Sequence, residues 1–192
     1  MNRDPGIALR IGVLAMFSLV LSVLGMHSTP LFDVDEGAFS EATREMLYSG
    51  DFGFTYLNGL PRFDKPILLY WLQAIAMGVL GQNEVGARLV SLLAGLASAW
   101  IAARFLAKWS ERPESSLVVF ALYCSCFGPL VMRHAATADA LLNLWLTVCA
   151  CCLVESLRLK QLQGALLEHV KSAQSHLRLA WVACALAVLT KG

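Results

Sequence analysis

The sequence predicts an all-α, polytopic helical membrane protein. Of its 192 residues, 57% are hydrophobic and only 15% are charged, and the mean hydropathy is +0.61. Soluble proteins carry about a quarter charged residues, so this apolar excess indicates a lipid environment. The formal net charge is +1 and no basic cluster is present, so the sequence gives no indication of nucleic-acid binding.

Five apolar segments are predicted to cross the bilayer within one membrane domain over residues 1–192. They lie near residues 11–29, 85–107, 114–132, 139–154 and 178–190. Basic residues precede the first segment and follow the second and fourth, as at Arg10, Lys108 and Lys160. The positive-inside rule therefore predicts a cytoplasmic N-terminus, and it places the loop over residues 30–84 on the outer face.

This outer loop contains two segments that suit interfacial helices. Phe39, Thr43 and Met46 recur at helical spacing, and Ser49 to Asp51 is predicted to end that helix. Pro66 favours the start of a second helix, whose apolar run over residues 67–80 is too short for a full span. We expect both helices to lie in the membrane interface.

The adjacent carboxylates Asp35 and Glu36 are the candidate catalytic residues. They follow the outer end of the first span, where a carboxylate can act as a general base at the membrane boundary. The alternative is helix capping, in which Asp33 is the cap and Glu36, three residues on, completes a capping box.

Arg62, Asp64 and Lys65 form a second candidate site just before the second interfacial helix. The two cations can hold a phosphate at the depth of the lipid headgroups. The alternative is that they contact ordinary phospholipid headgroups. Arg133 and Asp139 lie on the same outer side, where they are further candidates for substrate contact, although Asp139 could also cap its helix.

The six cysteines, at positions 124, 126, 149, 151, 152 and 184, all lie in apolar runs without the paired spacing of zinc ligands. We interpret them as small packing residues in membrane helices. The sequence predicts no metal site. The cofactor stays unassigned, because a divalent metal is compatible with a phosphate site but is not indicated by ligand spacing.

A set of short motifs resembles one family in order and spacing. The motifs are Phe32 to Gly37, Arg44 to Leu47, Leu57 to Pro61, Phe63 to Trp71, Glu84 to Leu89, Thr137 to Asp139 and Leu189 to Gly192. The chain resembles the N-terminal part of bacterial integral-membrane glycosyltransferases related to protein O-mannosyltransferases and to the aminoarabinose transferase of lipid A. Family members continue well beyond this length, so we expect an incomplete domain.

The resemblance implies a C-type glycosyltransferase fold and the transfer of a sugar from a polyprenyl-phosphate carrier on the non-cytoplasmic face, with inversion. The family's acidic motif corresponds to Asp35 and Glu36, and its second outer aspartate to Asp139. The Phe-Glu-Lys-Pro motif corresponds to residues 63–66, where Asp64 replaces glutamate and Lys65 contacts the carrier phosphate. Lys191, in the closing motif, is a further substrate contact.

The expected partners are the polyprenyl-phosphate sugar donor, a lipid or protein acceptor and membrane lipids, without nucleic acid. The expected location is the bacterial cytoplasmic membrane. Two other classes stay open at this point. A transporter also places charges at membrane boundaries, but typically has broken helices or repeated halves near the midplane. A noncatalytic membrane scaffold would need none of these charges for chemistry.

Overall fold

The structure, a computed structural model, consists almost entirely of helices. It describes residues 5–28, 30–31, 34–110, 114–161 and 167–192. Its helices are α1 (Pro5–Ser28), α2 (Val34–Ser49), α3 (Leu68–Leu80), α4 (Glu84–Ala107), α5 (Ser115–Ser125), α6 (Phe127–His134), α7 (Asp139–Gln161) and α8 (Leu167–Lys191). Strands β1 (Tyr56–Leu57) and β2 (Leu60–Pro61) form one short antiparallel hairpin. The prediction of an all-α protein is confirmed.

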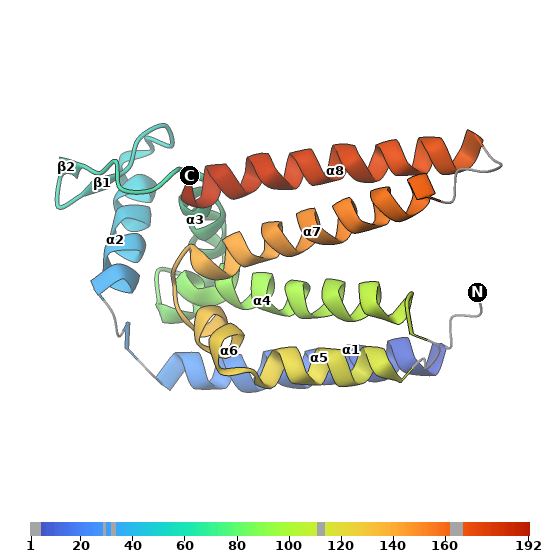
Figure 1. The fold of residues 1–192 in the computed structure, drawn as a ribbon. Helices are drawn as coiled ribbons and strands as arrows, with labels where there is room; N and C mark the ends of the chain where they lie inside the picture. The colour runs from blue at the N-terminus through green and yellow to red at the C-terminus, as the bar shows by residue number, and fades with distance from the viewer. Residues whose placement is uncertain (1–4, 29, 32–33, 111–113, 162–166) are drawn as a thin grey trace.

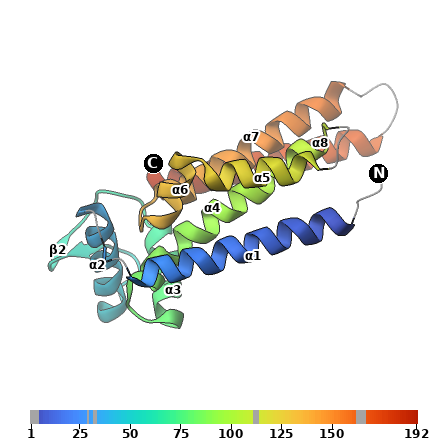
Figure 2. The same cartoon turned by 90° about the horizontal axis from the view of Figure 1, so that it is seen from below.

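Apart from the short helix α6, the helices have two orientations. Helices α1, α4, α5, α7 and α8 run along one axis, whereas α2 and α3 lie across that axis at one end of the bundle (Figure 1). Seen from below, α2 and the hairpin again lie beyond one end, and the N-terminus lies at the other (Figure 2). Helices α2 and α3 are therefore oriented differently from the long helices, and their location in the membrane interface stays a prediction.

The long helices have the length and surface of membrane helices. Within the described residues, α4 and α7 are long and apolar enough to cross a membrane, and the bent pair of α5 and α6 is a third if counted as one span. Large apolar side chains stay exposed on the bundle, including Phe17 on α1, Val118 on α5 and Trp181 on α8. An apolar surface this extensive requires contact with lipid, so the chain is a membrane protein.

Helix α4 is the centre of the bundle and packs against α1, α3, α5, α6 and α7. Its buried positions are mostly small, including Ala87, Ala94, Gly95, Ala99 and Ala103. Small residues let helix backbones approach closely, which favours association where lipid removes the hydrophobic driving force. The small residues of α4 therefore explain how one helix contacts five others.

Helices α7 and α8 form an extensive antiparallel pair. The buried residues of α8 recur at helical spacing and are mostly alanines, namely Ala173, Ala180, Ala183 and Ala187, with Thr190 near the end of the helix. The buried Ser156 hydroxyl of α7 donates to the Ala173 carbonyl at 3.0 Å. Both helices are longer than the spans predicted near residues 139–154 and 178–190, because the polar sequence between them continues each helix.

The segment predicted to span near residues 114–132 is divided in two. Helices α5 and α6 meet at Cys126 and differ in direction by 63°. Pro129 follows the break in the first turn of α6, where the missing N–H of proline causes no loss. An unbroken helix would place that proline in its interior, so the break matches the sequence chemistry.

The crosswise helices end at the predicted positions. Helix α2 ends at Ser49, and the next residue, Gly50, has a φ of 69°. Helix α3 begins soon after Pro66 and ends before Gly81, whose φ is 91°. Glycine adopts positive φ without steric cost. The proposed capping residue Asp33 lies outside the described residues.

Candidate active site

The β1–β2 hairpin is hydrogen-bonded to α2 and directly precedes the candidate phosphate site. The turn residues Asn58 and Gly59 have φ values of 55° and 73°, as a tight primed hairpin turn requires. Both turn amides donate to the Glu45 carboxylate of α2, at 2.6 Å and 3.2 Å. These two bonds hold the hairpin, which directly precedes Arg62, against α2.

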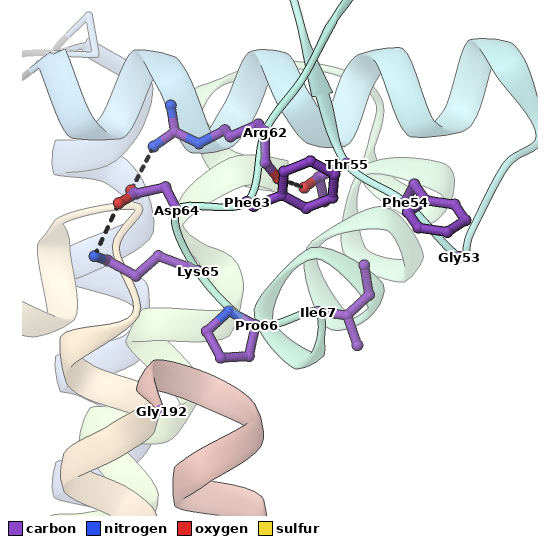
Figure 3. Close-up of a pocket in the computed structure, with 10 residues that line it drawn as sticks. All are labelled: Gly53, Phe54, Thr55, Arg62, Phe63, Asp64, Lys65, Pro66, Ile67 and Gly192. Carbon is purple, nitrogen blue, oxygen red and sulfur yellow. Dashed lines mark hydrogen bonds and ion pairs between the residues drawn. The ribbon is translucent and has the colours of Figure 1, made fainter.

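Arg62, Asp64 and Lys65 form a chain of charges after the hairpin (Figure 3). Arg62 Nη2 lies 2.9 Å from Asp64 Oδ2, and Lys65 Nζ lies 3.3 Å from Asp64 Oδ1. The Arg62 guanidinium also lies over the Phe39 ring of α2, 5.5 Å from its centroid. Two cations therefore share one carboxylate, which leaves the cluster with a net positive charge for an anion.

This cluster lines a pocket of about 470 Å³ at the end of the bundle. The lining residues come from the loop after α2 and from the end of α8: Gly53, Phe54, Thr55, Arg62, Phe63, Asp64, Lys65, Pro66, Ile67 and Gly192. A pocket that combines two cations with exposed phenylalanines suits a phosphate attached to an apolar or sugar group.

Tyr70, in the first turn of α3, is buried and lies near Arg62, which lines this pocket. Burial raises the pKa of its phenol, and the nearby Arg62 guanidinium opposes that shift only in part. Neither the Tyr70 hydroxyl nor Arg62 Nε has a hydrogen-bond partner within the described residues. The phenol is therefore a neutral group beside the cation, and both atoms retain hydrogen-bonding capacity.

Asp139 and Lys191 form an ion pair next to the pocket. Lys191 is the last residue of α8, and its Nζ pairs with Oδ1 of Asp139, the first residue of α7. The Thr137 hydroxyl donates to the other oxygen of Asp139 at 3.3 Å. Because Gly192 lines the pocket, this pair lies at its border. The structure thus brings five predicted site residues to one region.

The two predicted catalytic carboxylates have opposite surroundings. Asp35 is exposed, lacks a hydrogen-bond or ion-pair partner among the described residues, and is not a pocket-lining residue. Glu36 is only 3% exposed and pairs with Arg88 of α4 at 2.8 Å. Its carboxylate also accepts the Ala136 N–H from the loop before α7, and the predicted capping box with Asp33 lies partly outside the described residues. Of the two, only Asp35 is available to a substrate.

Arg133 does not reach the pocket. It is 7% exposed and packs on α4, where a Cβ added at Gly95 would meet Arg133 Cβ at 2.6 Å. Within the described residues, Arg133 Nε has no hydrogen-bond partner. The structure therefore places Arg133 between helices, apart from Arg62 and Lys65.

Arg88, Tyr70 and Glu45 are residues of this region whose importance the sequence did not reveal. Arg88 did carry a signal, because an arginine inside a predicted membrane span requires a partner or a function. Tyr70 resembled an ordinary interface anchor, and Glu45 resembled a surface residue of α2. Among the described residues, no group of three His, Cys, Asp or Glu side chains is arranged to hold a metal.

Comparison with known proteins gives consistent matches over the chain. Residues 11–192 match the family described as dolichyl-phosphate-mannose-protein mannosyltransferase. The chain is 30% identical over 187 residues to the undecaprenyl phosphate-alpha-4-amino-4-deoxy-L-arabinose arabinosyl transferase of Yersinia enterocolitica, covering 94% of this chain and 31% of that protein. It is 28% identical over 194 residues to the protein of the same name from Yersinia pestis, covering 99% and 32%.

Two solved structures share the fold. ArnT from Cupriavidus metallidurans in the apo state has a TM-score of 0.83 and 24% identity, covering 100% of this chain and 34% of ArnT. The structure of ArnT bound to undecaprenyl phosphate has a TM-score of 0.81 and 24% identity, covering 98% and 33%. The expected C-type glycosyltransferase fold is confirmed. The chain spans about a third of the length of these relatives.

Proposed function

Because the chain belongs to the dolichyl-phosphate-mannose-protein mannosyltransferase family, we propose that the protein is an integral-membrane glycosyltransferase. It moves a sugar from a polyprenyl-phosphate carrier to a lipid or protein acceptor, with inversion at the anomeric carbon. The names of the curated relatives, which are transferases with an undecaprenyl-phosphate sugar, support this donor class.

The observation that carries this proposal is the position of the Arg62–Asp64–Lys65 cluster. The cluster lines a pocket at the end of the bundle where α2 and α3 lie crosswise (Figures 1 and 3). A polyprenyl chain stays in the bilayer and holds its phosphate at headgroup depth, which is the depth of an interfacial helix. The pocket thus offers cations where the carrier presents its charge.

In the transfer, the acceptor oxygen attacks the anomeric carbon from the side opposite the phosphate. The new bond to the acceptor forms as the bond to the phosphate oxygen breaks, and the polyprenyl phosphate leaves with the electron pair. Arg62 and Lys65 stabilise the charge that grows on this leaving group. Asp64 holds the two cations in place, because it bonds both of them.

For a hydroxyl acceptor, Asp35 takes the proton as attack proceeds. It is exposed in the first turn of α2, and α2 lies at the end of the bundle where α8 ends (Figure 1). An acceptor phosphate is already anionic, and Asp35 then orients the sugar without accepting a proton. Asp139 and Lys191 border the pocket and contact the substrate from the α7 and α8 side.

We place the protein in the bacterial cytoplasmic membrane with the N-terminus in the cytoplasm. Basic residues lie at the C-terminal ends of α4 and α7. They are Arg104, Lys108, Arg158 and Lys160. The positive-inside rule favours a cytoplasmic location for those ends. The pocket then faces the periplasm or the cell exterior.

The test is a transfer assay with the purified native protein in lipid nanodiscs. Undecaprenyl-phosphate sugars, labelled in the sugar, are supplied with lipid and protein acceptors, and products are separated by mass. Label appearing in an acceptor, with release of unlabelled undecaprenyl phosphate, supports the proposal. Donor binding without release would indicate a carrier-binding scaffold, and translocation of intact donor would indicate a transporter.

A further inference from the structure

A buried ion pair joins α2 to α4 outside the pocket. Glu36 and Arg88 are each 3% exposed. Arg88 Nε donates to Glu36 Oε1 at 2.9 Å, and Arg88 Nη2 donates to Glu36 Oε2 at 2.8 Å. This paired geometry is the strong, orienting form of an arginine–carboxylate contact.

The same two side chains reach two further segments. Glu36 Oε1 accepts the Ala136 N–H at 2.6 Å, and Arg88 Nη2 donates to the Pro30 carbonyl at 2.9 Å. Pro30 lies in the connection between α1 and α2, and Ala136 lies in the connection between α6 and α7. One ion pair therefore ties both connections to α4.

These contacts adjoin the two acidic residues assigned to substrate. Asp35 directly precedes Glu36, and Asp139 follows Ala136 by three positions. The intervening Thr137 and Ala138 are buried, and the Thr137 carbonyl accepts the Ser91 hydroxyl of α4 at 3.1 Å. The backbone on either side of the catalytic region is thus fixed by side chains of one central helix.

A second set of hydrogen bonds lies beside the Glu36–Arg88 ion pair. The Ala87 carbonyl, next to Arg88, accepts Gln73 Nε2 of α3 at 2.8 Å. Gln73 Oε1 in turn accepts the Thr43 hydroxyl of α2 at 2.5 Å. The first turns of α4 are therefore linked by hydrogen bonds to both α2 and α3.

Resting on the function proposed above, we propose that Arg88 and Glu36 are positioning residues that set the Asp35 and Asp139 carboxylates relative to each other. Both Glu36 oxygens accept bonds from Arg88, and one also accepts an amide, so Glu36 does not serve as the proton acceptor. A misplacement of about 1 Å can cost about 10²-fold in rate. The expected signature of losing the pair is a fall in kcat while the phosphate cluster still binds donor.

Three variants separate positioning from proton transfer and from folding. Glu36→Gln keeps an acceptor for Ala136 but presents an amide N–H₂ to the guanidinium. Arg88→Lys keeps the charge but loses the paired fork. Glu36→Gln/Arg88→Met removes both charges and fills the arginine space, an exchange that buried ion pairs often tolerate without loss of stability.

Each variant is studied in the native protein in nanodiscs, by single-turnover kinetics over a range of pH and by hydrogen exchange of peptides that contain residue 136. We expect Glu36→Gln and the double variant to lower kcat by about 10²-fold, with the donor KM within about threefold of the native value. The kcat of Arg88→Lys should lie between the kcat of these two variants and that of the native protein. The acidic limb of the pH–rate profile should persist, and exchange near residue 136 should accelerate.

The matched control is Glu41→Gln. Glu41 lies on the same helix and pairs with Arg44, but that pair is at the surface, so kcat and exchange near residue 136 should not change. Loss of the acidic limb in Glu36→Gln would identify Glu36 as the base and overturn the proposal. Native kcat in a folded double variant would overturn it as well. The exchange measurement needs no turnover, so it remains informative if the proposed transferase activity is absent.

Discussion

Lys191, the last residue of α8, pairs with Asp139, the first residue of α7, so that a single ion pair closes the end of the helical hairpin nearest the pocket. Both side chains remain 39% exposed. An exposed pair contributes only about 0.2–1 kcal/mol to stability. The pair therefore contributes little to folding, and substrate contact is its proposed role.

Asp139→Asn tests that explanation. We expect the thermal midpoint to change little, because the lost pair is exposed, while transfer falls at least tenfold if Asp139 contacts the substrate. A double-mutant cycle with Lys191→Met is measured by single-turnover kinetics and by thermal unfolding. It gives the coupling between Asp139 and Lys191 in the transfer rate and in stability. Coupling seen in stability alone would assign the pair a structural role.

Lys65→Ala should weaken donor binding by about 1.5–3 kcal/mol, the value of one hydrogen bond to a charged group. Lys65→Arg should restore part of that affinity, because a planar fork does not reproduce a point charge. Binding of undecaprenyl phosphate is measured by calorimetry in nanodiscs. The control is Arg44→Ala, which removes a cation from the exposed face of α2; equal losses in the two variants would indicate a general charge effect.

Asp35→Asn preserves size and removes the ability to accept a proton. If Asp35 is the general base, donor binding should persist while turnover falls by about 10²–10⁴-fold. Asp51→Asn is the control in the same outer loop, since the Asp51 oxygen that accepts the Gly53 and Phe54 amides has an equivalent in asparagine. Native turnover in Asp35→Asn would remove Asp35 from the mechanism and leave it as a carboxylate in the first turn of α2.

The proposed orientation, with a cytoplasmic N-terminus, predicts that the β1–β2 hairpin and the α7–α8 connection lie on opposite sides of the membrane. Single cysteines at Leu60, which is 70% exposed on β2, and at Lys160, near the end of α7, are introduced into a background without native cysteines. A membrane-impermeant maleimide added to intact cells should label position 60 and leave position 160 unlabelled. The reverse pattern would invert the topology.

Gly95→Ala should destabilise the bundle by about 1–3 kcal/mol, the usual cost of overpacking. The added methyl group would lie 2.6 Å from Arg133 Cβ, which cannot move away as the far end of a side chain can. Gly12→Ala on α1 is the control, because its added Cβ meets nothing within 4 Å. Thermal inactivation in detergent compares the two variants, and equal stability would argue against close packing of α4 and α6.

Local chemistry explains which features were predictable. Proline favours the start of a helix and glycine adopts the positive φ that follows its end, so Pro66 and Gly81 delimit α3 and these boundaries follow from sequence. The motif that contains Arg62, Asp64 and Lys65 is likewise contiguous, and the structure keeps it together in one pocket.

Features that depend on distant residues were not predictable. Glu36 and Arg88 are 52 positions apart, and nothing adjacent to either residue indicates the pairing. Arg133 resembled a boundary cation, and its burial depends on the glycine that α4 presents to it. The division of α5 from α6 had a local signal in Pro129, but the 63° change of direction depends on the surrounding helices.

The contribution of Gly192 to the pocket has a consequence for biosynthesis. The loop over residues 53–67 is translated early, yet the wall that it shares with α8 exists only after more than a hundred further residues have been inserted. Until α7 and α8 have assembled beside α4, the cationic loop faces the membrane surface without that wall. A nascent chain arrested before α8 is therefore expected to expose Lys65 more fully to water-soluble amine reagents, and completion of α8 adds Gly192 to the pocket lining.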